Sequence, residues 1–182
     1  MHAAGTVVQF KPTQHSHLVA YLAALHAGCI THDRTVATFL PPLSHEKLLT
    51  WWKGRIAEVS DGTRVIYILV KDATIRPSGT DLLGVVMLSM PFSETGKARG
   101  VVEKLLVHQS HRGKGAAREL LNALQVDALQ RGRTLLTLDT ETGSDAEEVY
   151  KKLGWTEVGR IPKYAISPDG ELKDETFFYK QL

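Results

Sequence analysis

Short apolar runs and longer amphipathic segments alternate along the chain. Apolar or β-branched runs bounded by turn residues indicate strands, whereas apolar residues recurring every three or four positions indicate helices. The strands that this pattern predicts are 6–12, 64–70, 82–90, 100–107, 134–139, 156–161 and 176–180. The predicted helices are 14–27, a segment that begins after Ser44, 113–130, and a short segment around Tyr150.

The order of these elements predicts how the strands pair. The strand 100–107, the helix 113–130 and the strand 134–139 follow one another directly, and a crossover helix of this kind implies parallel neighbours. The runs 64–70 and 82–90 instead predict an antiparallel hairpin across the turn-rich segment 72–80. The fold class expected is α/β (α+β), with a mixed sheet and helices on both faces.

Helix boundaries are predicted from capping residues and breakers. Thr13 is placed to cap the helix 14–27, and Ser44 is placed to cap the next helix. Between them, the segment 28–43 has no helical or strand period and ends at two adjacent prolines, so it is predicted to be irregular.

Length, charge and cysteine content limit the class of protein. The 182 residues suit one domain, 1–182. A formal charge of +2 predicts no nucleic-acid partner, and the lack of a long apolar run or a secretory signal predicts no membrane association. Cys29 is the only cysteine, which fits a reducing compartment, so we expect a cytoplasmic protein.

Histidines and carboxylates do not form a metal motif. His15, His17 and His26 include no HExxH pair and no carboxylate-supported cluster. We therefore expect these three to be solvated surface residues, and no metal site.

The segment after the strand 100–107 has the residues of an anion-binding loop. Small residues replace large ones where a helix should begin, which leaves backbone N–H groups bare at the positive end of its dipole. These residues are Arg112, Gly113, Lys114, Gly115, Ala116 and Ala117. A phosphate or diphosphate would suit such a site.

Spacing distinguishes between the known phosphate loops. A dinucleotide fingerprint requires a third small residue where Arg118 stands, and a Walker A loop requires Gly-Lys-Ser/Thr where Lys114 is followed by Gly115. The remaining pattern, [Q/R]-x-x-G-x-[G/A], is met by Arg112, Gly115 and Ala117. It resembles the acetyl-CoA diphosphate loop of the GNAT superfamily of N-acetyltransferases.

A second segment resembles the same superfamily. Tyr150 lies on the apolar face of a short helix that Gly154 ends, like the superfamily's tyrosine helix followed by Gly-Phe. The stretch from Asp139 to Ser144, and that from Tyr164 to Gly170, are similar to the tabtoxin resistance protein branch, which acetylates a small β-lactam amino acid.

The resemblance covers essentially the whole chain and implies a fold and a cofactor. It implies a mixed, mostly antiparallel sheet whose fourth and fifth strands splay apart around the pantetheine arm of acetyl-CoA. Leu105, Leu106 and Val107 would line that arm, and Ser144 would also contact the cofactor. No metal is implied.

The chemistry of acetyl transfer to an amine requires an acid and a base. Tyr150 is the candidate acid for the leaving thiolate, because a phenol stays protonated at neutral pH. Glu103 and Asp139 are the candidate bases, although the branch would align its early carboxylate with Val101. The oxyanion would bind a backbone N–H around Leu106 or Val107.

Three residues are candidates for the acceptor wall: Trp51, Trp52 and Tyr164. Adjacent tryptophans cannot share one narrow helical face, so at least one ring lines a groove or covers an edge of the core, unless both are core. The acidic group of Asp169, Glu171, Asp174 and Glu175 would either hold a cationic acceptor or form a solvated turn.

The sequence therefore predicts an acetyl-CoA-dependent N-acetyltransferase that acts on the primary amine of a small molecule by direct attack in a ternary complex. A protein or peptide acetyltransferase and a non-catalytic acyl-CoA sensor are the alternatives. A monomer or a homodimer is expected.

Overall fold

A computed structural model describes residues 5–72, 74 and 76–182. Residues 1–4, on which the expectation of no secretory signal partly rests, lie outside the described residues, as do Ala73 and Ile75 in the predicted turn 72–80. The strands are β1 (Thr6–Gln9), β2 (Arg64–Val70), β3 (Leu82–Ser89), β4 (Arg99–Val107), β5 (Leu135–Glu141), β6 (Thr156–Ile166) and β7 (Leu172–Gln181). They form one sheet in the order β1-β2-β3-β4-β5-β7-β6.

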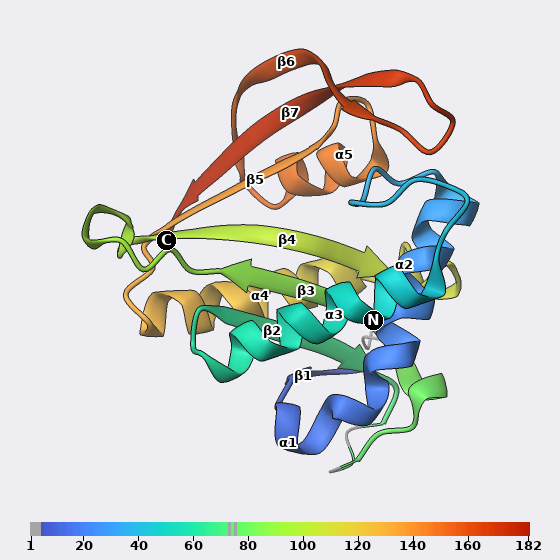
Figure 1. The fold of residues 1–182 in the computed structure, drawn as a ribbon. Helices are drawn as coiled ribbons and strands as arrows, with labels where there is room; N and C mark the ends of the chain where they lie inside the picture. The colour runs from blue at the N-terminus through green and yellow to red at the C-terminus, as the bar shows by residue number, and fades with distance from the viewer. Residues whose placement is uncertain (1–4, 73, 75) are drawn as a thin grey trace.

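The sheet is antiparallel except where β4 meets β5. These two strands pair in parallel only from Arg99 opposite Leu135 to Val101 opposite Thr137. Beyond that point β5 follows β7 away from β4, and the two strands separate visibly toward the right of Figure 1. The mixed sheet and its splayed pair are as predicted.

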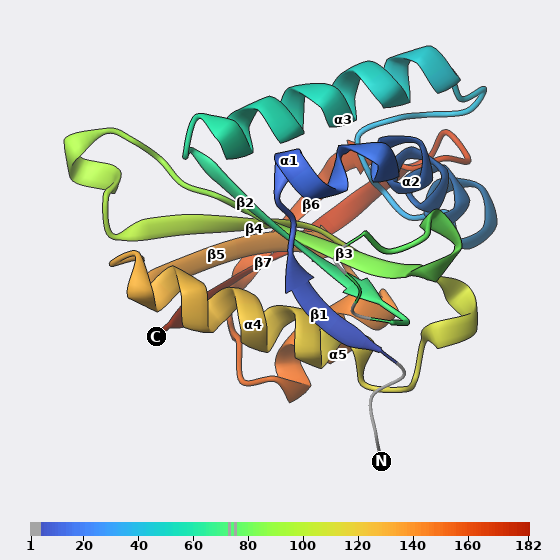
Figure 2. The same ribbon diagram turned by 90° about the horizontal axis from the view of Figure 1, so that it is seen from below.

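Helices cover both faces of the sheet (Figure 2). The helices are α1 (Pro12–His15), α2 (Val19–Asp33), α3 (His45–Ser60), α4 (Ala116–Gln130) and α5 (Asp145–Lys152). α1, α2 and α3 lie on one face, and α4 and α5 lie on the other. One apolar cluster forms under each layer, and β2 and β3 supply residues to both because their side chains alternate between the faces.

Two predicted helix starts were wrong and one was right. The first helix begins at Pro12 rather than after a Thr13 cap, because proline suits the first helical position. α4 begins at Ala116 rather than Gly113, since Gly113 and Gly115 adopt the left-handed φ angles of +70° and +87°. The Ser44 cap is confirmed: its Oγ accepts the backbone N–H of Lys47 at 3.3 Å.

Three segments extend further than predicted. α2 continues to Asp33, because buried Cys29 and Ile30 prolong its apolar face into the segment expected to be irregular. The strands predicted at 156–161 and 176–180 are the inner parts of the longer β6 and β7, which pair as far as Ile166 opposite Leu172. Many side chains of these extensions are exposed, so hydrophobic patterning did not reveal them.

The prediction that the three N-terminal histidines are solvated was wrong for two of them. His15 is 4% exposed and accepts the backbone N–H of Lys11 at 2.9 Å. His26 is fully buried on α2, where its Nε2 lies 2.8 Å from the carbonyl oxygen of Ala37. Because a carbonyl only accepts, Nε2 donates this hydrogen bond. It fixes the α2–α3 link to α2.

We expect acid to destabilise the fold through His26. Burial lowers the pKa of this imidazole to about 4 from 6.5, so between these pH values the unfolded chain binds a proton that the folded chain does not. The free energy of unfolding should therefore fall on acidification, by up to about 3 kcal/mol from this group. Urea denaturation at several pH values measures this change in the free energy of unfolding.

The matched variants are His26→Gln, which keeps an N–H donor without a titrating ring, and His45→Gln, which removes an exposed histidine. The His26 variant should lose part of the pH dependence of stability between pH 6.5 and 4. An unchanged pH dependence in that variant would contradict the assignment.

Candidate active site

The gap between β4 and β5 begins beside a bulge in β4. Glu103 pairs with Met87 and Leu106 pairs with Val85, so Lys104 and Leu105 together oppose one residue of β3. Lys104 has a φ angle of +52°, an uncommon conformation for a residue with a side chain. The bulge interrupts the alternation of side chains, at the place where β4 loses contact with β5.

The geometry identifies one backbone donor that faces this gap. His108 donates its backbone N–H to the carbonyl of Leu83 at 2.8 Å, and Gly84 is the next pair, opposite Val107. Hydrogen-bonded and non-hydrogen-bonded pairs alternate in an antiparallel ladder, so the Val107 N–H points away from β3. Of the two residues predicted to supply the oxyanion donor, Val107 has this orientation.

The predicted diphosphate loop ends at an open helix N-terminus. Gly115 is the N-cap residue of α4, and no side chain caps the helix. The first N–H groups of α4 are therefore available to an anion at the positive end of the helix dipole. A Cβ at Gly113 or Gly115 would meet no neighbouring atom within 4 Å, so these glycines serve the left-handed turn rather than tight packing.

Two basic side chains of the loop contact the protein itself. Arg112 donates from Nε to the carbonyl of Val107 at 3.0 Å and forms an ion pair with Asp33 at the end of α2. Lys114 donates from Nζ to the carbonyl of Ser110 at 2.9 Å. Arg112 thus braces the loop against α2, which leaves backbone N–H groups as the main contacts for a phosphate.

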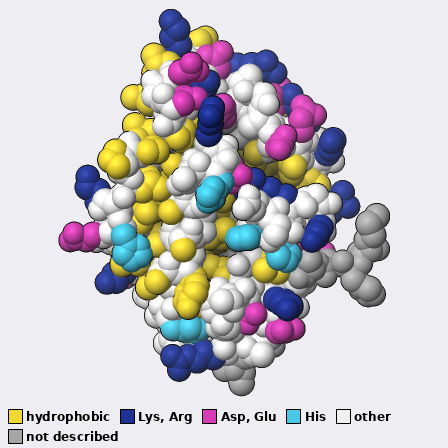
Figure 3. Space-filling view, turned by 90° about the vertical axis from the view of Figure 1, so that its right-hand side faces the viewer, with side chains coloured by type: hydrophobic (Ala, Val, Ile, Leu, Met, Phe, Trp, Pro, Cys, Tyr) yellow, Lys and Arg dark blue, Asp and Glu magenta, His cyan; other side chains and the backbone are white. Residues whose placement is uncertain are grey.

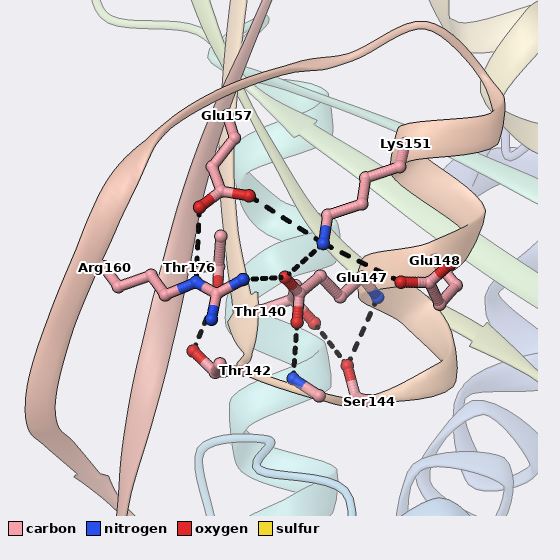
Figure 4. Close-up of polar contacts among 10 residues, drawn as sticks. Thr140, Thr142, Ser144, Glu147, Glu148, Lys151, Glu157, Arg160 and Thr176 are labelled. Carbon is pink, nitrogen blue, oxygen red and sulfur yellow. Dashed lines mark hydrogen bonds and ion pairs between the residues drawn. The ribbon is translucent and has the colours of Figure 1, made fainter.

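A buried carboxylate fastens α5 to the sheet (Figure 4). Glu147 is 2% exposed and accepts from Lys151 at 2.7 Å, from Arg160 of β6 at 3.2 Å and from the backbone N–H of Gly143. The Ser144 hydroxyl caps the helix by accepting the N–H of Glu147 at 3.3 Å. Ser144 therefore has a role in the fold, and its predicted contact with the cofactor stays a prediction.

This attachment fixes Tyr150, which faces the core from the next turn of α5. Tyr150 is 5% exposed and packs against Trp155 and Phe178, with ring centroids 5.8 and 6.0 Å away. Burial, and then the nearby charge of Asp139, raise the pKa of the phenol well above its usual value of 10. The phenol therefore keeps its proton at neutral pH.

The two candidate bases lie in different environments. Glu103 accepts a hydrogen bond at 2.8 Å from Arg64, a guanidinium that is only 4% exposed and also pairs with Glu58. Asp139 is exposed on β5. Glu103 therefore has a structural partner in the buried Arg64, whereas Asp139 is open to solvent.

Sequence reasoning missed the burial of a third carboxyl group. Asp169, Glu171 and Asp174 are exposed, as a solvated turn would be, whereas Glu175 is 5% exposed. Burial, followed by the neighbouring carboxyl of Asp139, raises the pKa of Glu175 to about 8. The signal in the sequence was the β7 alternation that places Glu175 on the same face as Phe177, a pattern visible only once the full length of β7 is known.

The three residues predicted to form the acceptor wall lie in different environments. Trp52 is fully buried, so it is a core residue, while Trp51 is half-buried and has Lys104 and Arg55 over its ring at 5.5 and 5.3 Å. Tyr164 is 53% exposed on β6 and packs edge-on against Phe177 at 5.2 Å.

The α2–α3 link and the turn between β6 and β7 approach each other at one end of the molecule. Arg34 and Asp169 form a 4.0 Å ion pair there, beside a cavity that Pro41, Leu43 and Pro168 also line. Figure 3 looks onto this end, where hydrophobic side chains form a band with charged groups gathered above it.

Neither a metal cluster nor a membrane helix is found in the part of the chain that the structure describes. No group of three or more potential metal ligands comes together among these residues. No described helix has both the length and the apolar character needed to cross a bilayer.

The contacts of Glu147 predict that an isosteric substitution there has a large effect on the free energy of unfolding. Glu147→Gln would turn an amide N–H2 toward donors and should lower the free energy of unfolding by about 1–3 kcal/mol. Glu148→Gln, on the same helix but with a side chain 61% exposed, should change it by less than about 0.5 kcal/mol. Equal effects of the two changes in chemical denaturation would contradict this account of α5.

Comparison with known proteins agrees with the geometry. The model of the acetyltransferase (GNAT) family matches residues 31–155. An L-methionine sulfoximine/L-methionine sulfone acetyltransferase of Salmonella typhimurium is 26% identical over 161 residues, which cover 88% of this chain and 83% of that protein.

Two solved structures show the same fold at low identity. An acetyltransferase structure from Salmonella typhimurium with acetyl-CoA has a TM-score of 0.74 and 17% identity, over 98% of this chain and 94% of its own. A ribosomal-protein-alanine N-acetyltransferase from Brucella melitensis has a TM-score of 0.71 and 18% identity, over 97% and 99%. The family model matches well over half of the 182 residues of the present chain. The chain therefore belongs to the acetyltransferase (GNAT) family, whose enzymes use acetyl-CoA as the acyl donor.

Proposed function

We propose that this enzyme transfers the acetyl group of acetyl-CoA to the primary amine of a small molecule, with both substrates bound together. What supports this most is that three suitable groups lie on elements beside the β4–β5 gap: the N–H of Val107 on β4, the buried phenol of Tyr150 on α5 and the exposed carboxylate of Asp139 on β5, whose charge acts on that phenol. These are the groups that attack on a thioester requires.

Binding would follow the shape of the gap. The diphosphate would lie on the N–H groups at the start of α4, around Gly115, Ala116 and Ala117, with Lys114 nearby. The pantetheine arm would run between β4 and β5 along Leu105, Leu106 and Val107, where strand pairing has ended. The thioester carbonyl would then accept a hydrogen bond from the Val107 N–H, which stabilises the tetrahedral oxyanion.

The chemistry divides between the two sides of the gap. The acceptor amine loses a proton toward the carboxyl group of Asp139 and attacks the thioester carbon. When the carbon–sulfur bond breaks, the Tyr150 phenol donates its proton to the thiolate. The high pKa of this phenol keeps that proton available at every pH at which the enzyme is expected to work.

The names of similar proteins support a small acceptor. The relative from Salmonella typhimurium is named for L-methionine sulfoximine and L-methionine sulfone, and one structural neighbour of TM-score 0.75 is titled a phosphinothricin N-acetyltransferase. The ribosomal-protein acetyltransferase with the same fold keeps a protein acceptor as the second candidate.

The direct test is release of free CoA thiol from acetyl-CoA over a panel of amines. The panel contains L-methionine sulfone, other amino acids, β-lactam amino acids, polyamines and short peptides. We expect turnover with a small amine and a decrease in kcat of about 100-fold or more in Tyr150→Phe, because that variant lacks the general acid. Peptide turnover that exceeds all small amines would favour the second candidate, and cofactor binding without turnover would indicate a sensor.

Two carboxyl variants distinguish the candidate bases. Asp139→Asn should lower kcat by about 100-fold or more, since it removes the proton acceptor. Glu103→Gln should mainly lower stability, because it leaves the buried Arg64 with one partner fewer. The reverse result, with kcat lost in the Glu103 variant alone, would make Glu103 the base.

A further inference from the structure

Glu175 is a buried ionisable group that the mechanism above does not use. Its side chain lies on β7 and is 5% exposed, and its Oε2 receives no hydrogen bond from any residue in the described part of the chain. An ionised carboxylate buried without a donor is costly. The site therefore favours a positive charge beside Glu175, either a proton or a bound cation.

The sheet register places Glu175 beside the proposed base. Asp139 lies opposite Phe177 and Glu141 lies opposite Glu175, and residues directly opposite in an antiparallel pair share one face of the sheet. Asp139 and Glu175 are thus diagonal neighbours on the acceptor side. The β6 residue opposite Glu175 is the uncharged Ile161.

The charges around Glu175 are unbalanced. From β5 it faces the carboxyl groups of Asp139 and Glu141, and from β4 it faces the ammonium of Lys104. Burial lowers the pKa of Lys104, and that side chain also lies over the ring of Trp51 and near Glu103. With three carboxyl groups and one lysine, the group would carry excess negative charge unless an additional cation were bound. With a pKa of about 8, Glu175 itself holds a proton at neutral pH when no other cation is present.

We propose that Asp139 and Glu175 form a pair that holds one exchangeable positive charge: a proton on Glu175 in the empty site, and the ammonium group of the acceptor in the occupied site. This inference rests on the proposed function and adds Glu175 to its catalytic residues. It also explains why a primary ammonium would be preferred to a neutral amide or alcohol, which could not replace the proton.

The protons balance over one turnover. Binding of the ammonium releases the Glu175 proton to solvent. One N–H proton first passes by way of Asp139 to Glu175, which restores the empty-state protonation, and the neutral nitrogen then attacks the thioester carbon. The carbon–sulfur bond then breaks, the thiolate takes the Tyr150 proton, and the remaining excess N–H proton returns the phenol to its starting form. The net reaction releases one proton, an amide and CoA thiol.

Proton exchange can be measured without knowing the natural acceptor. Methylguanidinium is a suitable probe, because guanidinium groups keep their charge up to a pH of about 12 and so cannot supply the released proton. Isothermal titration at pH 7 in buffers of different ionisation enthalpy, with CoA bound, gives the number of protons released per cation. We expect a release approaching one proton for the native enzyme and none for Glu175→Gln, which keeps an N–H donor toward Asp139 but cannot ionise.

Kinetics provide a second readout. With L-methionine sulfone, or the fastest amine of the panel, Glu175→Gln should raise KM and lower kcat/KM by about 10-fold or more. Its pH profile should lack the ionisation near pH 8 that we expect for the native enzyme. Glu94→Gln, which changes an exposed carboxylate on the loop between β3 and β4, should behave like the native enzyme. Thermal unfolding and acetyl-CoA binding show that the variants are folded.

Each outcome decides between the two proposals. Equal proton release in the native enzyme and the Glu175 variant would overturn the proposed charge exchange, and so would failure of methylguanidinium to compete with the amine. Turnover in the same samples would still support the proposed N-acetyltransferase function. No turnover with any amine would overturn the proposed function, although proton release by methylguanidinium would still report on the Asp139–Glu175 pair.

Discussion

The separation of β4 from β5 determines where the loop before α4 and the helix α5 must be held. The two strands pair over Arg99–Val101 and Leu135–Thr137 only, and then β5 takes β7 as its single strand neighbour. A buried strand edge without partners would leave several backbone N–H and C=O groups without hydrogen bonds, which is unfavourable in free energy. The β4 bulge and the divergence of β5 instead leave this edge open to a ligand. Backbone groups that would otherwise pair within the sheet are thus available to the pantetheine amides of acetyl-CoA and to a developing oxyanion.

The remaining contacts hold the two sides of this gap in place. On one side, the ion pair of Arg112 with Asp33 ties the loop before α4 to α2. On the other side, Glu147 joins α5 to β6 and so fixes the position of Tyr150 (Figure 4). Glu147 is buried and therefore requires a complete set of partners, whereas the ion pair of Arg112 with Asp33 lies nearer the surface. The positions of Tyr150 and of the loop before α4 thus depend on these polar contacts as well as on the apolar core.

Much of this arrangement could be predicted from the sequence. The alternation of apolar runs gave every strand of the sheet, and the short connections through α4 gave the parallel pair. The loop from Arg112 to Ala117 and the helix around Tyr150 indicate the family from sequence alone, because glycine positions and helical faces are local properties of a sequence.

What the sequence did not give depends on contacts between distant segments. Nothing local shows that Arg64 neutralises Glu103 or that His26 is enclosed by α3 and the α2–α3 link. The burial of Glu175 was missed for the same reason: it stands in an acidic, turn-like stretch, and only its pairing opposite Glu141 places it beside Asp139. The missed features are charged or polar groups whose environment is set by tertiary structure.

Amide hydrogen exchange with and without the cofactor shows whether acetyl-CoA occupies the gap between β4 and β5. We expect slower exchange at the N–H of Val107 and at those of Ala116 and Ala117, with little change at Val101, where β4 already pairs with β5. Cofactor binding that left the amides of Val107 and the α4 N-terminus unprotected would contradict this binding position.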